Sequence, residues 1–254
     1  MTSFFDRIKS GRASYNYAMT PTTGYAEDEI YGVPLSQMYW QNVGTASTAL
    51  ATGIVYSASG FAAGTLTPTG PLVSGGVATF DVPRGIRMTA SVNLSTVTFT
   101  IRGTDAWGAP QTWSGVGPTG NTLGNAGSYV DSTVTFKTVT TASSGSGSVG
   151  TTAFYIGNNN DYGLYYYIGN VNRVVAVTTD GAFATIPWTV TAGLATTTAP
   201  TATTADVRGK ITLSTTALAN GSRSYAFIYV TPNVGVSAAN DTKENTYGQT
   251  PYTA

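Results

Sequence analysis

The chain contains few of the side chains that carry out chemistry. Its 254 residues include no His and no Cys, and only 9% are charged. Without imidazole or thiol groups, Ser-His-Asp hydrolysis, Cys-His proteolysis and structural zinc sites are excluded. Catalysis would have to use paired carboxylates, Lys, Tyr or a metal held by oxygen, and the 12 acidic residues would have to supply most of it.

Two polar runs have the residue types of a calcium site. Residues 27–29 are three contiguous acids, but calcium loops space their ligands at alternate positions around a Gly turn, and Ile30 and Tyr31 follow directly. A solvated or Arg-paired patch explains this run better. Residues 158–161 (Asn-Asn-Asn-Asp) offer four side-chain oxygens, but a hairpin turn accounts for the same letters because Asn tolerates positive φ. We therefore predict no metal site, with calcium as the alternative.

The remaining acids do not form a catalytic pair. A glycosidase needs two carboxylates brought together across one cleft. Most Asp residues of this chain instead occur where turns are expected, a position that Asp favours for local hydrogen bonds: Asp81, Asp105, Asp131, Asp161, Asp180 and Asp206. We predict that the protein is not an enzyme and uses no cofactor.

Aromatic residues are the other candidates for a site. Tyr162 and the run 165–167 could stack on a sugar, together with Trp107, which we expect to be exposed beside a turn glycine. Strand alternation would place Tyr165 and Tyr167 on one face and Tyr166 on the other. The structural alternative is a core-plus-interface role for these tyrosines. Core positions are expected for Trp113 and Trp188.

The composition predicts the elements that hold these residues. Thr, Val, Ile, Tyr and Phe are frequent while Leu, Glu and Lys are scarce, a profile typical of strands. Nine runs have strand character: 77–82, 85–92, 96–104, 133–141, 164–168, 173–179, 182–190, 207–214 and 224–231. Turns are expected at 103–108, 158–163 and 219–222. The fold class predicted is all-β, an antiparallel β-sandwich of Greek-key or jelly-roll type.

The same pattern predicts the organisation of the chain. Residues 1–45 read as an extended N-terminal arm, 46–232 as the sandwich with a possible division near 143–150, and 233–254 as a C-terminal tail. No apolar run is long enough to span a membrane, and the first residues do not resemble a signal peptide. The net charge of zero argues against nucleic acid as the main partner.

Arm and tail carry the residues expected to bind a protein partner. Aromatic groups without a core of their own need another surface, and the basic residues at the start of the arm could pair with carboxylates, touch a packaged genome or remain solvated. The predicted contact residues are Phe4, Phe5, Arg7, Tyr15, Tyr17, Tyr39, Trp40, Tyr247 and Tyr252. Three arginines at strand ends, Arg84, Arg87 and Arg102, are predicted to form cross-strand pairs or solvent-facing rows.

Three segments carry a resemblance to a known family. Residues 97–108 (Val-Thr-Phe-Thr-Ile-Arg-Gly-Thr-Asp-Ala-Trp-Gly) are similar to a strand F-T-V-x-G-T-D and Gly turn found in virion structural proteins of tailed bacteriophages. Residues 136–140 with 147–150 resemble the next strand pair of that family, and 206–210 with 220–222 resemble its C-terminal hairpin. The order is kept across roughly residues 85–232. The resemblance implies a non-enzymatic β-sandwich associated with a capsid or tail.

These observations together predict a capsid cement or decoration protein. It would be a homo-oligomer, a trimer or dimer, located in the virion after assembly in the bacterial cytoplasm. Its partners would be the major capsid protein or other virion proteins, bridged by the arm and tail. Two alternatives stay open: a structural protein of the head–tail junction or tail tube, and a receptor- or glycan-binding virion module.

Overall fold

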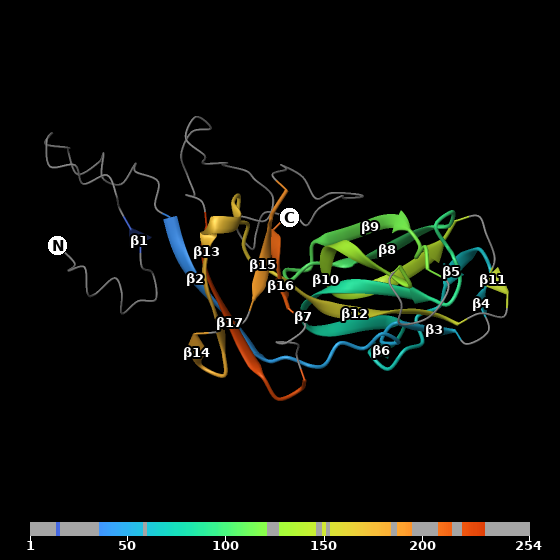
Figure 1. Cartoon of the computed structure of the whole chain (residues 1–254), viewed down its shortest axis with the longest axis horizontal. Coiled ribbons are helices and arrows are strands. Elements are labelled where there is room, and N and C mark those ends of the chain that lie inside the picture. The colour runs from blue at the N-terminus through green and yellow to red at the C-terminus, as the bar shows by residue number, and fades with distance from the viewer. Residues whose placement is uncertain are drawn as a thin grey trace, which may run out of the picture.

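The computed structural model describes residues 14–15, 36–57, 60–120, 127–145, 149–150, 153–183, 187–194, 208–214 and 220–231. These residues form antiparallel β-sheets, which confirms the predicted all-β sandwich class (Figure 1). One 3-10 turn, η1 (Val171–Arg173), lies among them. The described residues include no helix of the length and apolarity that crossing a membrane requires.

The larger sheet has ten strands. Seven follow one another across the sheet, in the order β15 (Trp188–Ala192), β16 (Gly209–Leu213), β12 (Phe154–Gly163), β7 (Val77–Ala90), β10 (Tyr129–Ser144), β8 (Thr98–Thr104) and β9 (Pro110–Val116). Three short strands pair at the side of this path, β3 (Val55–Ser57) with β12, β5 (Gly64–Leu66) with β10, and β6 (Val73–Ser74) with β7. A separate pair is formed by β4 (Gly60–Phe61) and β11 (Val149–Gly150).

The second sheet has five strands. Their order is β1 (Ser14–Tyr15), β2 (Ser36–Thr45), β17 (Ser224–Thr231), β13 (Val174–Thr179) and β14 (Ala182–Phe183). In Figure 1 this sheet lies at one end of the molecule, and the β8–β9 hairpin belongs to the other part. Strand β2, near the start of the described chain, thus lies beside β17, at its end.

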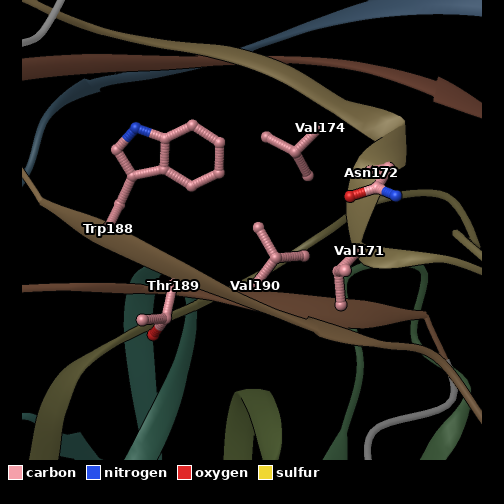
Figure 2. A pocket seen from close by; sticks show the side chains of 6 residues that line it. All are labelled: Val171, Asn172, Val174, Trp188, Thr189 and Val190. Atoms are coloured by element: carbon pink, nitrogen blue, oxygen red, sulfur yellow. The ribbon is translucent and has the colours of Figure 1, made fainter.

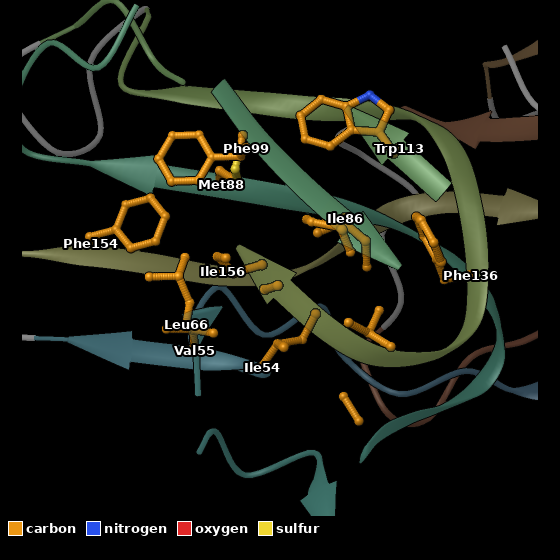
Figure 3. Close-up of a cluster of buried hydrophobic side chains, with 14 of the residues drawn as sticks. Ile54, Val55, Leu66, Ile86, Met88, Phe99, Trp113, Phe136, Phe154 and Ile156 are labelled. Atoms are coloured by element: carbon orange, nitrogen blue, oxygen red, sulfur yellow. The ribbon is translucent and has the colours of Figure 1, made fainter. Parts of the chain in front are cut away.

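The first hydrophobic core lies inside the ten-stranded sheet. Phe99 of β8 and Phe154 of β12 stack with ring centroids 5.2 Å apart, and Trp113 of β9 is buried with them (Figure 3). Along β8, Phe99 and Ile101 are buried while Thr98 and Arg102 are exposed. The alternation predicted for this strand is therefore confirmed, as is the core position of Trp113.

The second core lies between the five-stranded sheet and the β12–β16–β15 part of the larger sheet. Tyr225, Phe227 and Tyr229 of β17 face Tyr162 of β12 and Ile211 of β16. Strands β7 and β12 contribute to both cores. They also lie on either side of the possible division near 143–150 and pair directly with each other, so one continuous sheet connects the cores.

The predicted arm differs from the structure at its C-terminal end. Residues 36–45 form β2, which pairs with β17 over eight positions. Within β2, Tyr39, Gln41 and Val43 face the second core, whereas Trp40 and Asn42 face outward. Gln41, a polar residue at an inward position, interrupts the alternation of apolar and polar residues by which a strand is predicted. Residues 1–13, 16–35 and 232–254 lie outside the described part.

Two predictions between residues 158 and 168 are wrong. Residues 158–163 are not a hairpin turn but the end of β12, and residues 164–168 are not a strand. Asn158 accepts a hydrogen bond from the Leu50 amide at 2.9 Å, and Asn159 accepts one from the Asp161 amide at 2.9 Å. These side chains satisfy backbone groups at a register shift in a buried strand, a β-bulge that uses the same residue types as a turn.

The glycine of the Gly-Thr-Asp motif has a packing role. The turn predicted at 103–108 is confirmed as the β8–β9 hairpin, with Thr104 opposite Pro110. At Gly103 a Cβ would collide with the backbone carbonyl of Thr138 on the neighbouring strand β10. Only a residue without a side chain allows the two strands this close approach.

We expect Gly103→Ala to lower the free energy of unfolding by about 2 kcal/mol, because the methyl group forces β8 away from β10. Urea denaturation followed by circular dichroism measures the change. Thr98→Ala, at an exposed position of the same strand, is the control. Equal stabilities of the two variants would contradict the close approach.

Candidate functional site: an aromatic cluster at the junction of the two cores

Four aromatic rings from separate parts of the chain form one cluster, here called the aromatic site: Tyr39, Trp107, Tyr165 and Tyr166. The centroid of the Trp107 ring lies 5.9 Å from that of Tyr165, in an edge-on arrangement, and 5.8 Å from that of Tyr166. Tyr39 stacks on Tyr166 with centroids 4.0 Å apart. Trp107 is 41% exposed, and the three tyrosines are half-buried, so the cluster reaches the surface.

Trp107 is held in one orientation at the tip of the β8–β9 hairpin. The Asp105 carboxylate accepts hydrogen bonds from the Trp107 amide at 2.8 Å and the Ala109 amide at 3.0 Å, which closes the turn. The indole Nε1 donates to the Tyr165 carbonyl at 2.8 Å. An exposed Trp is usually free to change rotamer. In Trp107 both the backbone amide and the indole Nε1 are hydrogen-bonded, which holds the ring in place.

A buried ion pair lies behind the hairpin. Arg208 donates through Nε (2.9 Å) and Nη2 (2.7 Å) to the second oxygen of Asp105, and through Nη1 to the Tyr165 carbonyl (3.1 Å). The two side chains are 2% and 4% exposed. Arg208 therefore joins the turn at Asp105, 103 positions earlier in the chain, to the backbone under Tyr165, 43 positions earlier.

Gln41 of β2 supports the site from the other side. Its Nε2 donates to the Gly163 carbonyl at 3.0 Å, and its Oε1 accepts from the Tyr165 amide at 2.9 Å. The same oxygen lies 3.1 Å from the Tyr229 hydroxyl, which in turn accepts from the Tyr166 amide at 3.3 Å. Burial raises the pKa of Tyr229, so its hydroxyl stays protonated and can donate to Gln41.

The sequence predicted part of this site. Trp107 is exposed as expected, whereas Trp188, expected in the core, is half-buried at its edge. The alternation predicted for 165–167 is wrong because this segment is not a strand: Tyr167 is buried, and Tyr165 and Tyr166 both reach Trp107. The local turn bonds expected of Asp105 are confirmed. Its pairing with Arg208 and the role of Gln41 were not predicted, since each depends on a contact between distant segments.

The outward side of the five-stranded sheet is a second candidate surface, here called the outer face. Direct cross-strand pairing places on it Trp40 with Ile228, and Phe183 with Thr178, which pairs in turn with Ala226. Trp40 is 66% and Phe183 75% exposed, and Val175, in the bulge of β13, is 57% exposed. Large apolar side chains thus face solvent here without a charged residue at any of these positions.

A pocket opens at the edge of the second core. It has a volume of about 490 Å³ and lies between η1 with the start of β13 and strand β15 (Figure 2). Trp188, Val174 and Val190 face one another across it in Figure 2. The lining consists of Val171, Asn172, Val174, Trp188, Thr189 and Val190. None of these side chains titrates, so the pocket has no group for acid–base chemistry.

The proposed calcium ligands are engaged within the protein. Asp161 accepts from the Lys210 ammonium at 2.5 Å and from the Thr212 hydroxyl at 2.7 Å. Within the described ranges no three acidic residues gather as a metal site would require. Residues 27–29 lie outside these ranges.

The three arginines predicted to form cross-strand pairs or solvent-facing rows have three different environments. Arg87 lies opposite Asp131, bonds to it at 2.6 and 2.7 Å and covers the Tyr129 ring, which confirms a cross-strand pair. Arg102 is exposed. Arg84 is fully buried, so its prediction was wrong.

The structure describes three of the nine predicted partner-contact residues. Tyr39 is turned inward to the aromatic site, and Trp40 is on the outer face. Tyr15 pairs with Ser36 in β1. The others, Phe4, Phe5, Arg7, Tyr17, Tyr247 and Tyr252, lie outside the described residues.

Comparison with protein-family models, with curated proteins and with solved structures found no match to this chain.

Proposed function

We propose that the protein is a non-enzymatic structural protein of a tailed-phage virion, a capsid cement or decoration protein that attaches to the major capsid protein. The observation that carries this proposal is the outer face, where Trp40, Val175 and Phe183 are exposed together on one sheet. The resemblance of three sequence segments to virion structural proteins supports the same function.

The chemistry of the outer face fits attachment to a protein. Exposed apolar groups gathered on one face mark interaction sites, and aromatic residues contribute most of the binding energy at such sites. The buried Ala226 and Ile228 of β17 lie on the same face, between β2 and β13. The described residues that define the outer face carry no charge to desolvate, and the chain as a whole has a net charge of zero, so the fitting partner surface is apolar and uncharged.

Cement function requires a second contact on a neighbouring subunit. A second contact on the same particle adds to the first as an effective concentration, so weak contacts together produce stable binding. We assign this second contact to residues 1–35 and 232–254. Since residues 36–45 form β2, a deletion that tests the arm must stop at residue 35, because removal of residues 1–40 would cut the strand that pairs with β17.

The test is co-sedimentation of the purified chain with capsids that lack decoration. We expect saturation at a copy number that matches capsid symmetry. Trp40→Ala combined with Phe183→Ala should weaken binding at least about 30-fold, because the loss of even one well-packed aromatic anchor costs about 2 kcal/mol. Trp107→Ala, an exposed Trp away from the outer face, is the matched control and should bind normally.

Two results would contradict the proposal. Unchanged binding of the Trp40/Phe183 variant would exclude the outer face as the attachment surface. Absence of binding by the native chain, together with closed rings detected by light scattering, would move the protein to the head–tail junction or the tail tube.

A further inference from the structure

We infer that the aromatic site binds a neutral sugar ring. The indole plane of Trp107 has a fixed orientation. A pyranose ring binds proteins by packing its C–H face against an aromatic plane, and a preorganised plane loses little entropy on binding. The Trp107 side chain is 41% exposed while its Nε1 is bonded to the Tyr165 carbonyl, so the indole is held at the surface before any ligand arrives.

The site also has a hydrogen-bonding group beside its aromatic plane. A sugar also needs hydrogen-bonding groups beside the aromatic plane, and a Tyr hydroxyl can both donate and accept. Tyr165 contacts the Trp107 ring edge-on, and within the described part of the chain its hydroxyl makes no hydrogen bond. Burial and the charge of Asp81 raise the pKa of Tyr165, which keeps this hydroxyl a donor at neutral pH.

The ligand that fits this site is uncharged. The ionic groups under the site, Asp105 and Arg208, are buried and bonded to each other. They position Trp107 and the Tyr165 carbonyl but do not present charge to a ligand. A site of this kind selects a neutral hexose or N-acetylhexosamine over sialic acid, whose carboxylate would need a cationic partner.

This inference is independent of the attachment to capsids. Tyr39 and Trp40 are adjacent in β2, so their side chains point to opposite sides of the sheet. Tyr39 belongs to the aromatic site and Trp40 to the outer face. A particle could therefore hold the protein by one surface while the other meets a glycan.

The experiment applies the full chain to an array of immobilised neutral and sialylated glycans. Free glucose, galactose and N-acetylglucosamine are then used as competitors. We expect binding to neutral glycans, reduced at least about tenfold by Trp107→Ala. Trp107→Phe keeps an aromatic plane but loses the bond to Tyr165, and should be intermediate. Tyr165→Phe tests the hydroxyl and should also weaken binding.

Trp40→Ala is the matched control and should bind glycans as the native chain does. Circular dichroism and thermal melting confirm the fold of each variant; Trp107 lies at the surface, so its replacement should not unfold the protein. The inference is overturned if the native chain binds no glycan, binds only sialylated glycans, or binds neutral glycans equally well after Trp107→Ala.

Discussion

Replacement of Asp105 by Asn is expected to lower the free energy of unfolding by about 4 kcal/mol, since one partner of a buried ion pair is lost while the other stays buried. Asp105 makes four hydrogen bonds: two close the β8–β9 turn and two bind Arg208. An Asn side chain has one acceptor oxygen instead of two. Arg208 would then carry an uncompensated charge at a position 2% exposed.

Equilibrium urea denaturation measures this loss. The control is Asp131→Asn, which removes a carboxylate that accepts from Nε and Nη2 of Arg87 at side-chain exposures of 35% and 31%. A partly exposed surface pair of this kind contributes at most about 1 kcal/mol. If Asp105→Asn costs no more than Asp131→Asn, the ion pair does not support the hairpin.

The same substitution should also affect glycan binding. In Asp105→Asn the single remaining oxygen can accept from the turn amides or from Arg208 but not from both, so the orientation of the indole is no longer fixed from both sides. Stability and glycan binding should therefore fall together in Asp105→Asn. Trp107→Ala should reduce glycan binding alone, so the two variants separate the platform from its support.

The sequence predicted those elements in which local pattern and tertiary position agree. Strand β8 alternates between Thr outside and Phe99 or Ile101 inside, and the Gly-Thr-Asp motif that follows forms the expected turn. Strand β17 has the predicted bounds, because Tyr225, Phe227 and Tyr229 all face one core. In both strands one face is apolar throughout.

The predictions failed where a polar side chain occupies an inward position. Gln41 interrupts the apolar face of β2, and its reason for being there is three hydrogen bonds to residues 163, 165 and 229. Asn158 acts similarly in β12, where its side chain accepts from the Leu50 amide. Partners more than a hundred residues away leave no local pattern, so the aromatic rings of the site could be proposed but not the side chains that position them.

We expect the protein to lose stability at low pH because the counter-ion of a buried arginine loses its negative charge. Arg84 is fully buried between the two cores, with its guanidinium 4.3 Å from the Tyr162 ring centroid. Its Nε and Nη2 donate to Asp81 at 3.0 and 2.9 Å, and Nη2 also donates to the Ser47 carbonyl at 2.6 Å. Burial alone would raise the pKa of Asp81, but the hydrogen bonds and charge of Arg84, with further bonds from Ser47, outweigh it and lower this pKa to about 2.

A lowered pKa determines the direction of the pH effect. In the unfolded chain Asp81 titrates near pH 4, so its contribution to stability is complete above that pH and is lost as the pH falls towards 2. Asp81→Asn should remove the contribution at every pH. At pH 7 we expect this variant to be about 3 kcal/mol less stable, because the buried Arg84 loses its counter-ion.

The difference between the native chain and Asp81→Asn separates this effect from other carboxylates, which titrate in both proteins. Urea denaturation at several pH values should give curves that run apart above about pH 4 and converge towards pH 2. Parallel curves would mean that Asp81 and Arg84 do not form the pair. Convergence would show that one ionised carboxylate at the boundary of the two cores stabilises the strand that both share. Arg84 lies in this strand, β7, whose residues Phe80 and Ile86 belong to the first core and Val82 to the second.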